Sequence, residues 1–270
     1  MTMPPSNPAA LRIQRLNMDN SWHLQLGSLR LLVDPWLEGV EVDYFPLFNT
    51  QWHRTKPLDY SEIPPFDAVL ITQKYPDHFH LKTLKALSPS LVFAPASLGK
   101  KLAKHLPEAT VHTFDRTHPT RTHQEIRITW LPTPRKIDPI YDAWTLDDGN
   151  ESVFLATHGF QLTTAHHETL HGVSPCSLLV VPLNDYQLPA LLGGAITPGL
   201  EVLQQLVADL KPRFIVRTHD EDKHATGLVT RLSRIKVLTE ESIPQLKWLH
   251  SRYLPTPDYT PHDLLNPARV

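Results

Sequence analysis

The sequence has 270 residues, of which 41% are hydrophobic, so the chain can bury one substantial core and we expect a single domain over residues 1–270. Its 26 basic and 28 acidic residues give a formal net charge of −2. This balance, without a dense basic run, argues against binding to nucleic acid. Cys176 is the only cysteine, which excludes an intrachain disulfide.

No segment has the features of a targeting signal or a membrane anchor. The first fifteen residues contain no apolar run of signal-peptide length, and no stretch of about 18 uninterrupted apolar residues, the length of a membrane span, occurs anywhere. Together with the single cysteine, these features predict a soluble, cytoplasmic protein without a transmembrane segment.

The chain opens with alternating apolar and polar residues. Residues 11–17 and 22–35 alternate on either side of Gly27 and Ser28. This pattern predicts an antiparallel hairpin with one buried face.

A long irregular segment follows at residues 38–66. It has no sustained period and carries Tyr44, Phe45, Phe48 and Trp52 among prolines. Such an insertion loop serves either as a functional flap or as a cover for a sheet edge. As a flap, its aromatic side chains would offer a surface to a protein partner.

From Phe66 onward, short apolar runs alternate with amphipathic stretches, which predicts layered α/β structure. We expect strands at 68–72, 91–95, 110–114, 125–132, 177–183 and 213–219, a hairpin at 143–159, and helices at 80–87, 97–106 and 198–210. Thr197 precedes Pro198 and is the expected N-cap of the last helix. The proline-rich tail at 254–270 is expected to wrap the surface or fray.

Several short motifs follow this order of elements. Asp34 lies in "DPWL" after the first hairpin, the strand at 68–72 runs into "QKYPDH", and later strands end in "THGF" and "RTHDE". Over residues 11–225 this arrangement resembles the metallo-β-lactamase fold hydrolases. The resemblance implies a four-layer αββα sandwich, in which two mixed sheets are flanked by helices.

The family motif His-x-His-x-Asp-His falls on residues 73–78. Gln73 and Tyr75 replace its first two histidines, whereas Asp77 and His78 remain. In an extended loop, residues two apart project to the same side, so the missing histidines would have held one metal and the remaining pair a second.

The third histidine of the first family site would lie near Arg135 and Lys136. A glutamine and two cations do not replace imidazole ligands, so we expect the first metal site to be absent. The two cations would instead hold an anionic part of a substrate.

The resemblance implies that the second metal site is retained. His158 in "THGF" takes the place of a bridging aspartate, and His219 in "RTHDE" takes the place of the last family histidine. The expected ligands are Asp77, His78, His158 and His219. Three nitrogens and one oxygen suit a single Zn²⁺ or Fe²⁺ ion. The alternative is that these side chains only hydrogen-bond to one another.

Other residues are expected to assist this site. Asp34 and Gln73 would support the ligands from outside the coordination sphere. Asp77, Tyr75 and Arg135 are the candidate catalytic residues, with Tyr75 donating a hydrogen bond to a developing oxyanion.

Two functions of different classes remain open. The first is a one-metal hydrolase of phosphodiester, ester or lactone bonds that takes a small anionic or ester-type ligand. The second is an inactive pseudoenzyme that binds a ligand or a protein, because three of the family's metal ligands are lost. The sequence leaves the oligomeric state undetermined.

A rival motif, "HETLH" at residues 167–171, matches the zinc-peptidase pattern His-Glu-x-x-His. Gly172 follows at once and a buried strand is expected soon after, so there is no room for a long active-site helix. This context favours a surface helix on which His166, His167 and His171 face water or the rim of the pocket.

Overall fold

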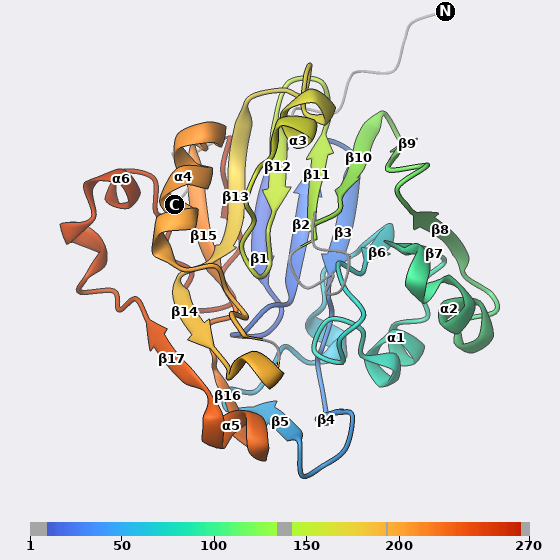
Figure 1. Ribbon diagram of the computed structural model, residues 1–270. Helices are drawn as coiled ribbons and strands as arrows, with labels where there is room; N and C mark the ends of the chain where they lie inside the picture. The colour runs from blue at the N-terminus through green and yellow to red at the C-terminus, as the bar shows by residue number, and fades with distance from the viewer. Residues whose placement is uncertain (1–9, 134–141, 193, 266–270) are drawn as a thin grey trace, which may run out of the picture.

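The computed structural model describes residues 10–133, 142–192 and 194–265. Two large sheets form its body (Figure 1). The first sheet has seven strands, in the order β18 (His262–Asp263), β1 (Leu11–Arg15), β2 (Trp22–Leu26), β3 (Leu29–Val33), β6 (Ala68–Leu70), β7 (Leu91–Pro95) and β8 (Thr110–Phe114). The second has six strands, in the order β15 (Phe214–Thr218), β13 (Cys176–Pro182), β12 (Ser152–Leu155), β11 (Ala143–Asp147), β10 (Ile126–Leu131) and β9 (Thr120–His123).

The hairpin β2–β3 forms as its sequence pattern predicts. Leu26 pairs with Leu29, which leaves a turn of two residues. Gly27 takes φ 56° in this turn, a conformation that glycine adopts without the steric cost of a side chain. The apolar residues of both strands face the core between the sheets, except Leu32, which packs on the outer face.

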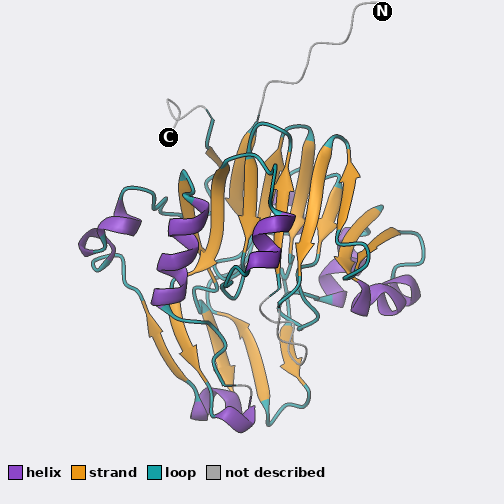
Figure 2. Ribbon diagram, turned by 45° about the horizontal axis from the view of Figure 1, so that its top comes forward, coloured by secondary structure: helices purple, strands orange, loops and turns teal. Residues whose placement is uncertain are grey.

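Helices cover the outer faces of both sheets (Figure 2). They are α1 (Leu81–Leu87), α2 (Gly99–His105), α3 (Thr164–Thr169), α4 (Leu200–Leu210) and α6 (Lys247–His250). Helix α5 (Leu228–Leu232) instead packs against two short strands below the large sheets, at residues 49–53 and 223–226 (Figure 1). Short 3-10 turns lie at Tyr60–Glu62, Ala96–Leu98, Ala190–Leu192 and Ile243–Gln245. None of the helices in the described part of the chain has the length and apolar character needed to cross a membrane.

Three apolar clusters define the layers. Between the sheets, Trp144 and Leu178 of the second sheet join Leu24 and Leu31 of the first. Helices α1 and α2 pack on the outer face of the first sheet, and helices α4 and α6 pack on the outer face of the second. Burying both faces of each sheet in this way stabilises a layered sandwich. The predicted four-layer αββα architecture is therefore confirmed.

Two small sheets lie below the large ones in Figure 1. One pairs β14 (Asn184–Gln187) with β17 (Arg234–Val237), and the other has the order β16 (Lys223–Thr226), β5 (Asn49–His53) and β4 (Val40–Asp43). The last two strands correct the expectation that residues 38–66 form an irregular loop. Their buried side chains are Glu41, Asn49 and Gln51, while Val40 is 56% exposed. Because polar residues take the inward positions, the usual hydrophobic signal of a strand is inverted.

The predicted N-cap of α4 is wrong. The helix begins at Leu200, and Gly199 occupies the cap position with φ 88°. The Thr197 hydroxyl instead donates to the carbonyl of Asn184 over 3.0 Å and accepts from the amide of Tyr186 over 2.9 Å. Its hydrogen-bonding capacity is thus used to hold β14.

Candidate metal centre

The candidate site lies where strands of both large sheets end. Thr72 to His78 follow β6, Thr157 to Gly159 follow β12, and His219 follows β15 directly. Strands β12, β13 and β15 run parallel, so their carboxyl ends meet at one edge. The crevice outside such carboxyl ends is the usual place for a ligand in α/β proteins.

Three buried histidines converge at this edge. One ring nitrogen from each of His78, His158 and His219 lies within 4.8 Å of the others. The Nε2 atoms of His78 and His158 are 3.0 Å apart, and two nitrogens bound to one tetrahedral Zn²⁺ lie about 3.4 Å apart. The spacing is therefore close to that of a shared metal ion.

Asp34 fixes the orientation of His78. Its Oδ2 atom accepts a hydrogen bond from Nδ1 of His78 over 2.6 Å, and both side chains are fully buried. When a neutral His78 donates its Nδ1 hydrogen to the carboxylate of Asp34, the lone pair of Nε2 points toward His158. Metal-binding histidines in proteins are commonly held in this way.

The protonation states of His158 and His219 also suit a metal ion. Burial, reinforced by the neighbouring cations, lowers the pKa of His158 and of His219 well below the usual value. Burial also lowers the pKa of His78, but the carboxylates of Asp34 and Asp77 outweigh it, so that this pKa is raised. A proton on Nε2 of His78 would be donated to His158, and a metal ion would compete for the same position.

Two ring nitrogens in this group have no hydrogen-bond partner among the described residues. They are Nδ1 of His158 and Nε2 of His219, and both are buried. Leaving a buried polar atom unsatisfied costs free energy, so such atoms call for an explanation such as a bound ion or water. Imidazole nitrogens are ligands that suit metal ions of intermediate softness, such as Zn²⁺ or Fe²⁺.

Asp77 lies between the histidines and a buried lysine. Its Oδ1 atom is 3.9 Å from Nε2 of His78, and its Oδ2 atom is 3.8 Å from Nζ of Lys223. The amide of Asn20 donates to the backbone carbonyl of Asp77 over 2.9 Å. These contacts hold the Asp-His pair of the family motif against the turn between β1 and β2.

Lys223 is a buried cation of the site, with a side chain only 8% exposed. Its Nζ atom is 3.1 Å from Oδ2 of Asp19 and 3.9 Å from Oε2 of Glu221. Burial lowers its pKa, but the carboxylates of Asp19, Glu221 and Asp77 outweigh this effect and raise the pKa well above the usual value. The side chain therefore remains an ammonium ion.

Sequence reasoning missed Asp19, Glu221 and Lys223. Asp19 lies in the polar turn between two strands and matches no motif. Lys223 and Glu221 lie in a charged run directly after a buried strand. That unusual position was the only signal in the sequence.

The other candidate residues lie at different places in relation to the site. Gln73 is buried and its amide donates to the hydroxyl of Thr157 over 3.0 Å. Tyr75 lines the cavity beside the site. Arg135 and its neighbour Lys136 lie outside the described residues. The structure brings together Asp34, Gln73, Asp77, His78, His158 and His219.

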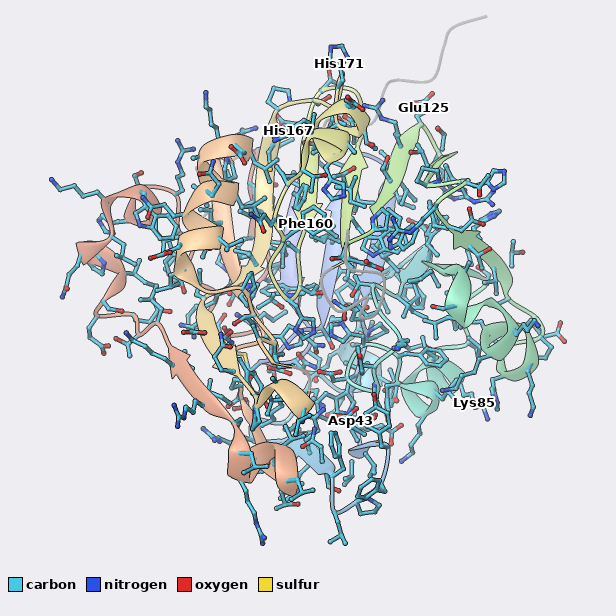
Figure 3. The ribbon with its side chains drawn as sticks, in the orientation of Figure 1. Asp43, Lys85, Glu125, Phe160, His167 and His171 are labelled. Atoms are coloured by element: carbon cyan, nitrogen blue, oxygen red, sulfur yellow. The ribbon has the colours of Figure 1, made fainter. Side chains whose placement is uncertain are left out.

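The "HETLH" segment lies elsewhere. Helix α3 ends at Thr169, so His171 falls beyond it and the two histidines do not share a helical face. In Figure 3 both His167 and His171 lie at the top of the molecule, far from Asp43 of the cavity. The neighbouring His166 is buried, and its Nε2 lies 3.0 Å from the carbonyl of Pro132.

A cavity of about 1040 Å³ opens onto the candidate site. Asp77, His158, His219 and Lys223 line its inner end. The remaining walls are largely apolar and come from three distant segments. They include Tyr44, Phe45, Phe48, Leu188, Leu191, Ile196, Val229, Ile235 and Val237. Tyr44 is 78% exposed and Leu191 98%, so apolar side chains also surround the mouth.

The family of the chain follows from comparison with known proteins. Residues 16–219 match the family model described as the beta-lactamase superfamily domain. The chain belongs to this superfamily, as its order of elements predicts. A search of curated protein sequences gave no significant match.

Solved structures share the fold at low sequence identity. An isothiocyanate hydrolase from Delia radicum gut bacteria has a TM-score of 0.65 and 14% identity, over 93% of this chain and 98% of its own. A possible metal-dependent hydrolase from Veillonella parvula has a TM-score of 0.65 and 12% identity, over 95% and 100%. CmlA, a diiron beta-hydroxylase from Streptomyces venezuelae, has a TM-score of 0.58 and 15% identity, over 78% and 45%. The fold therefore occurs in proteins with different chemistries.

Proposed function

We propose that this chain is a hydrolase that works with one metal ion, Zn²⁺ or Fe²⁺, held by His78, His158 and His219 with Asp77 as the fourth ligand. The observation that carries the proposal is the convergence of three buried imidazoles within 4.8 Å, two of them with an unpartnered ring nitrogen. Hydrogen bonding among the side chains alone leaves Nε2 of His219 unsatisfied, and an ion shared by the three rings would satisfy it, which favours a bound ion over a purely structural cluster.

The bound ion would supply a Lewis acid and a water molecule of lowered pKa. The residues of the chain determine how that chemistry is directed. Asp34 keeps His78 in one orientation through the 2.6 Å hydrogen bond. Tyr75, at the cavity wall, is the candidate to donate a hydrogen bond to a developing oxyanion. Arg135 is the candidate residue to bind an anionic group where a substrate carries one.

The cavity favours substrates with a large apolar group. Its outer walls are aromatic and aliphatic, and its polar part carries the carboxylates of Asp43, Asp77 and Glu221 together with the cations of Arg54 and Lys223. Apolar walls bind apolar groups, whereas a polar part in which both signs of charge are present gives no general attraction for an anion. We therefore propose neutral esters or lactones in preference to phosphodiesters. One structurally similar protein is an isothiocyanate hydrolase, so isothiocyanates belong in the same substrate panel.

The first test is the metal content of the protein, measured by elemental analysis after purification without a tag and without added metal. We expect about one Zn or Fe per chain, and loss of that ion in the His78→Ala/His219→Ala double variant. The double variant His118→Ala/His250→Ala, which removes two exposed histidines, is the matched control and should keep its ion.

Substrate preference is then measured on the loaded protein with p-nitrophenyl esters of increasing acyl length, aryl lactones, an aryl isothiocyanate and a p-nitrophenyl phosphodiester. We expect faster turnover of the longer esters. Absence of metal even after reconstitution would contradict the hydrolase proposal. It would leave the alternative of a binding protein, which the exposed Tyr44, Phe45 and Leu47 favour.

A further inference from the structure

A second group of ligand atoms adjoins the three histidines. Atoms of Asp19, Asp77 and His219 lie within 4.8 Å of one another, and His219 belongs to both groups. Two adjoining groups that share a side chain are the arrangement from which two-metal sites are built, with ions about 3.5–4 Å apart. Judged by its ligand atoms alone, this site could bind two metal ions.

The second group already contains a cation. Nζ of Lys223 lies 3.1 Å from Asp19 and 3.8 Å from Asp77, the two carboxylates of that group. The other oxygen of Asp19 accepts from the backbone amide of Glu221 over 3.1 Å. Both oxygens of Asp19 are therefore occupied by donors of the chain itself.

We infer that the ammonium of Lys223 takes the place of a second metal ion and limits the site to one. This inference rests on the proposed one-metal centre. A metal ion would need the carboxylate oxygens at about 2.0–2.2 Å, whereas the ammonium nitrogen lies at 3.1 Å from the same Asp19 oxygen. The ammonium fills the space against Asp19 and Asp77 that such an ion would need, so the two cannot be bound there at the same time.

The same geometry gives Lys223 a positioning role. Asp77 directs one oxygen toward the ammonium and the other toward His78. A carboxylate held from one side by a fixed cation offers its second oxygen in a defined direction. Lys223 thereby orients the fourth ligand of the proposed metal ion while it neutralises part of the surrounding negative charge.

The test is the number of ions bound at saturation, measured by elemental analysis and by Co²⁺ titration of metal-free protein. The wild type should bind one ion. Lys223→Met keeps the length of the side chain but removes its charge, and this variant should bind two. Lys223→Arg, which keeps the charge, and Lys82→Met, which removes an exposed lysine, should both bind one.

A second measurement detects whether the bound ions interact magnetically. With Mn²⁺, electron paramagnetic resonance should show an uncoupled ion in the wild type and an exchange-coupled pair in Lys223→Met. If that variant is unfolded without metal, refolding it against added Co²⁺ should reach its end point at two ions per chain.

The outcomes separate this inference from the proposed function. One ion in both the wild type and Lys223→Met would overturn the inference and leave the one-metal hydrolase intact. Two ions in the wild type would overturn it as well, because the ammonium would then have moved aside. No ion in either protein would overturn the proposed metal centre itself.

Discussion

Asp34 and His78 form a fully buried carboxylate-imidazole pair, with 2.6 Å between Oδ2 and Nδ1. Asp34 is itself held by Thr72, whose backbone amide and hydroxyl donate to it over 2.7 Å and 2.5 Å. The pair is thus anchored to the end of β6. A rigid anchor of this kind preorganises the imidazole before any ion arrives.

The first prediction concerns this anchor. Asp34→Asn keeps the shape of the side chain but weakens the acceptor for His78, and we expect the affinity for Zn²⁺ to fall about 10–100-fold. Competition with a chromophoric chelator measures the change. Asp67→Asn, which removes a carboxylate paired with Arg30 away from the site, should leave the affinity unchanged. An equal affinity in all three proteins would exclude a supporting role for Asp34.

The second prediction concerns the residue after His158. Gly159 has φ 83°, and a Cβ atom there would lie 2.6 Å from Cδ of Pro198. Gly159→Ala should therefore displace His158, weaken metal binding and lower the melting temperature. Gly172 has a similar φ of 76° but open space around it, so Gly172→Ala measures the backbone strain alone. Metal affinity should fall in the first variant and stay unchanged in the second.

The third prediction is a pH dependence. Burial, together with the charge of Asp77, raises the pKa of Asp43 to about 6, compared with about 3.9 in an unfolded chain. The folded protein therefore holds this proton more tightly than the unfolded chain does. The resulting stability is present below pH 4 and is lost as the pH rises through 6.

Urea unfolding of the metal-free protein at several pH values measures this effect. Relative to wild type, Asp43→Asn should gain up to about 3 kcal/mol of unfolding free energy between pH 4 and pH 7. Backbone hydrogen bonds lower the pKa of Asp115, which affects stability only below about pH 4, so the difference for Asp115→Asn should stay flat over this range. A flat difference for Asp43→Asn would contradict the raised pKa.

The fourth prediction concerns the core between the sheets. Leu178 of β13 is fully buried in that cluster. Leu178→Ala should lower the unfolding free energy by about 2–5 kcal/mol, because the transfer free energy is lost and a cavity remains. Leu228, which is 41% exposed, is the control position, and its alanine variant should lie within about 1 kcal/mol of wild type.

The fifth prediction separates the two histidine motifs. If "HETLH" is a surface segment, His167→Ala/His171→Ala should keep both the bound metal and any hydrolytic activity. His158→Ala should lose both. Loss of metal in the first variant alone would favour the peptidase alternative.

The sequence predicts the layered core well because apolar burial leaves a direct signature. Strand β7 occupies residues 91–95, as its continuous apolar run indicates, because a strand covered on both faces has no polar side. Strands β4 and β5 were not predicted, because their inward side chains are polar, and two of these, Asn49 and Gln51, line the cavity beside the candidate site. Binary patterning cannot recognise a strand whose buried positions serve a functional centre.

Of the candidate site, the sequence predicted only the residues that belong to recognisable motifs. Asp77, His78, His158 and His219 were named from the resemblance, and the structure brings them together, whereas metal binding remains a prediction. Asp19 and Lys223 are 204 residues apart and touch only because β1 and β15 end near each other. Pairings of that kind depend on tertiary structure and leave no local pattern.

The last described strand, β18, pairs with β1 along the outer edge of the seven-stranded sheet. It is only two residues long, and Asp263 on it forms an ion pair with Arg12. An uncovered edge would present free backbone groups to the same edge of another molecule, which is how sheets grow into fibres. This short, charged strand therefore protects the protein from edge-to-edge aggregation, and shortening the chain before His262 would remove that protection.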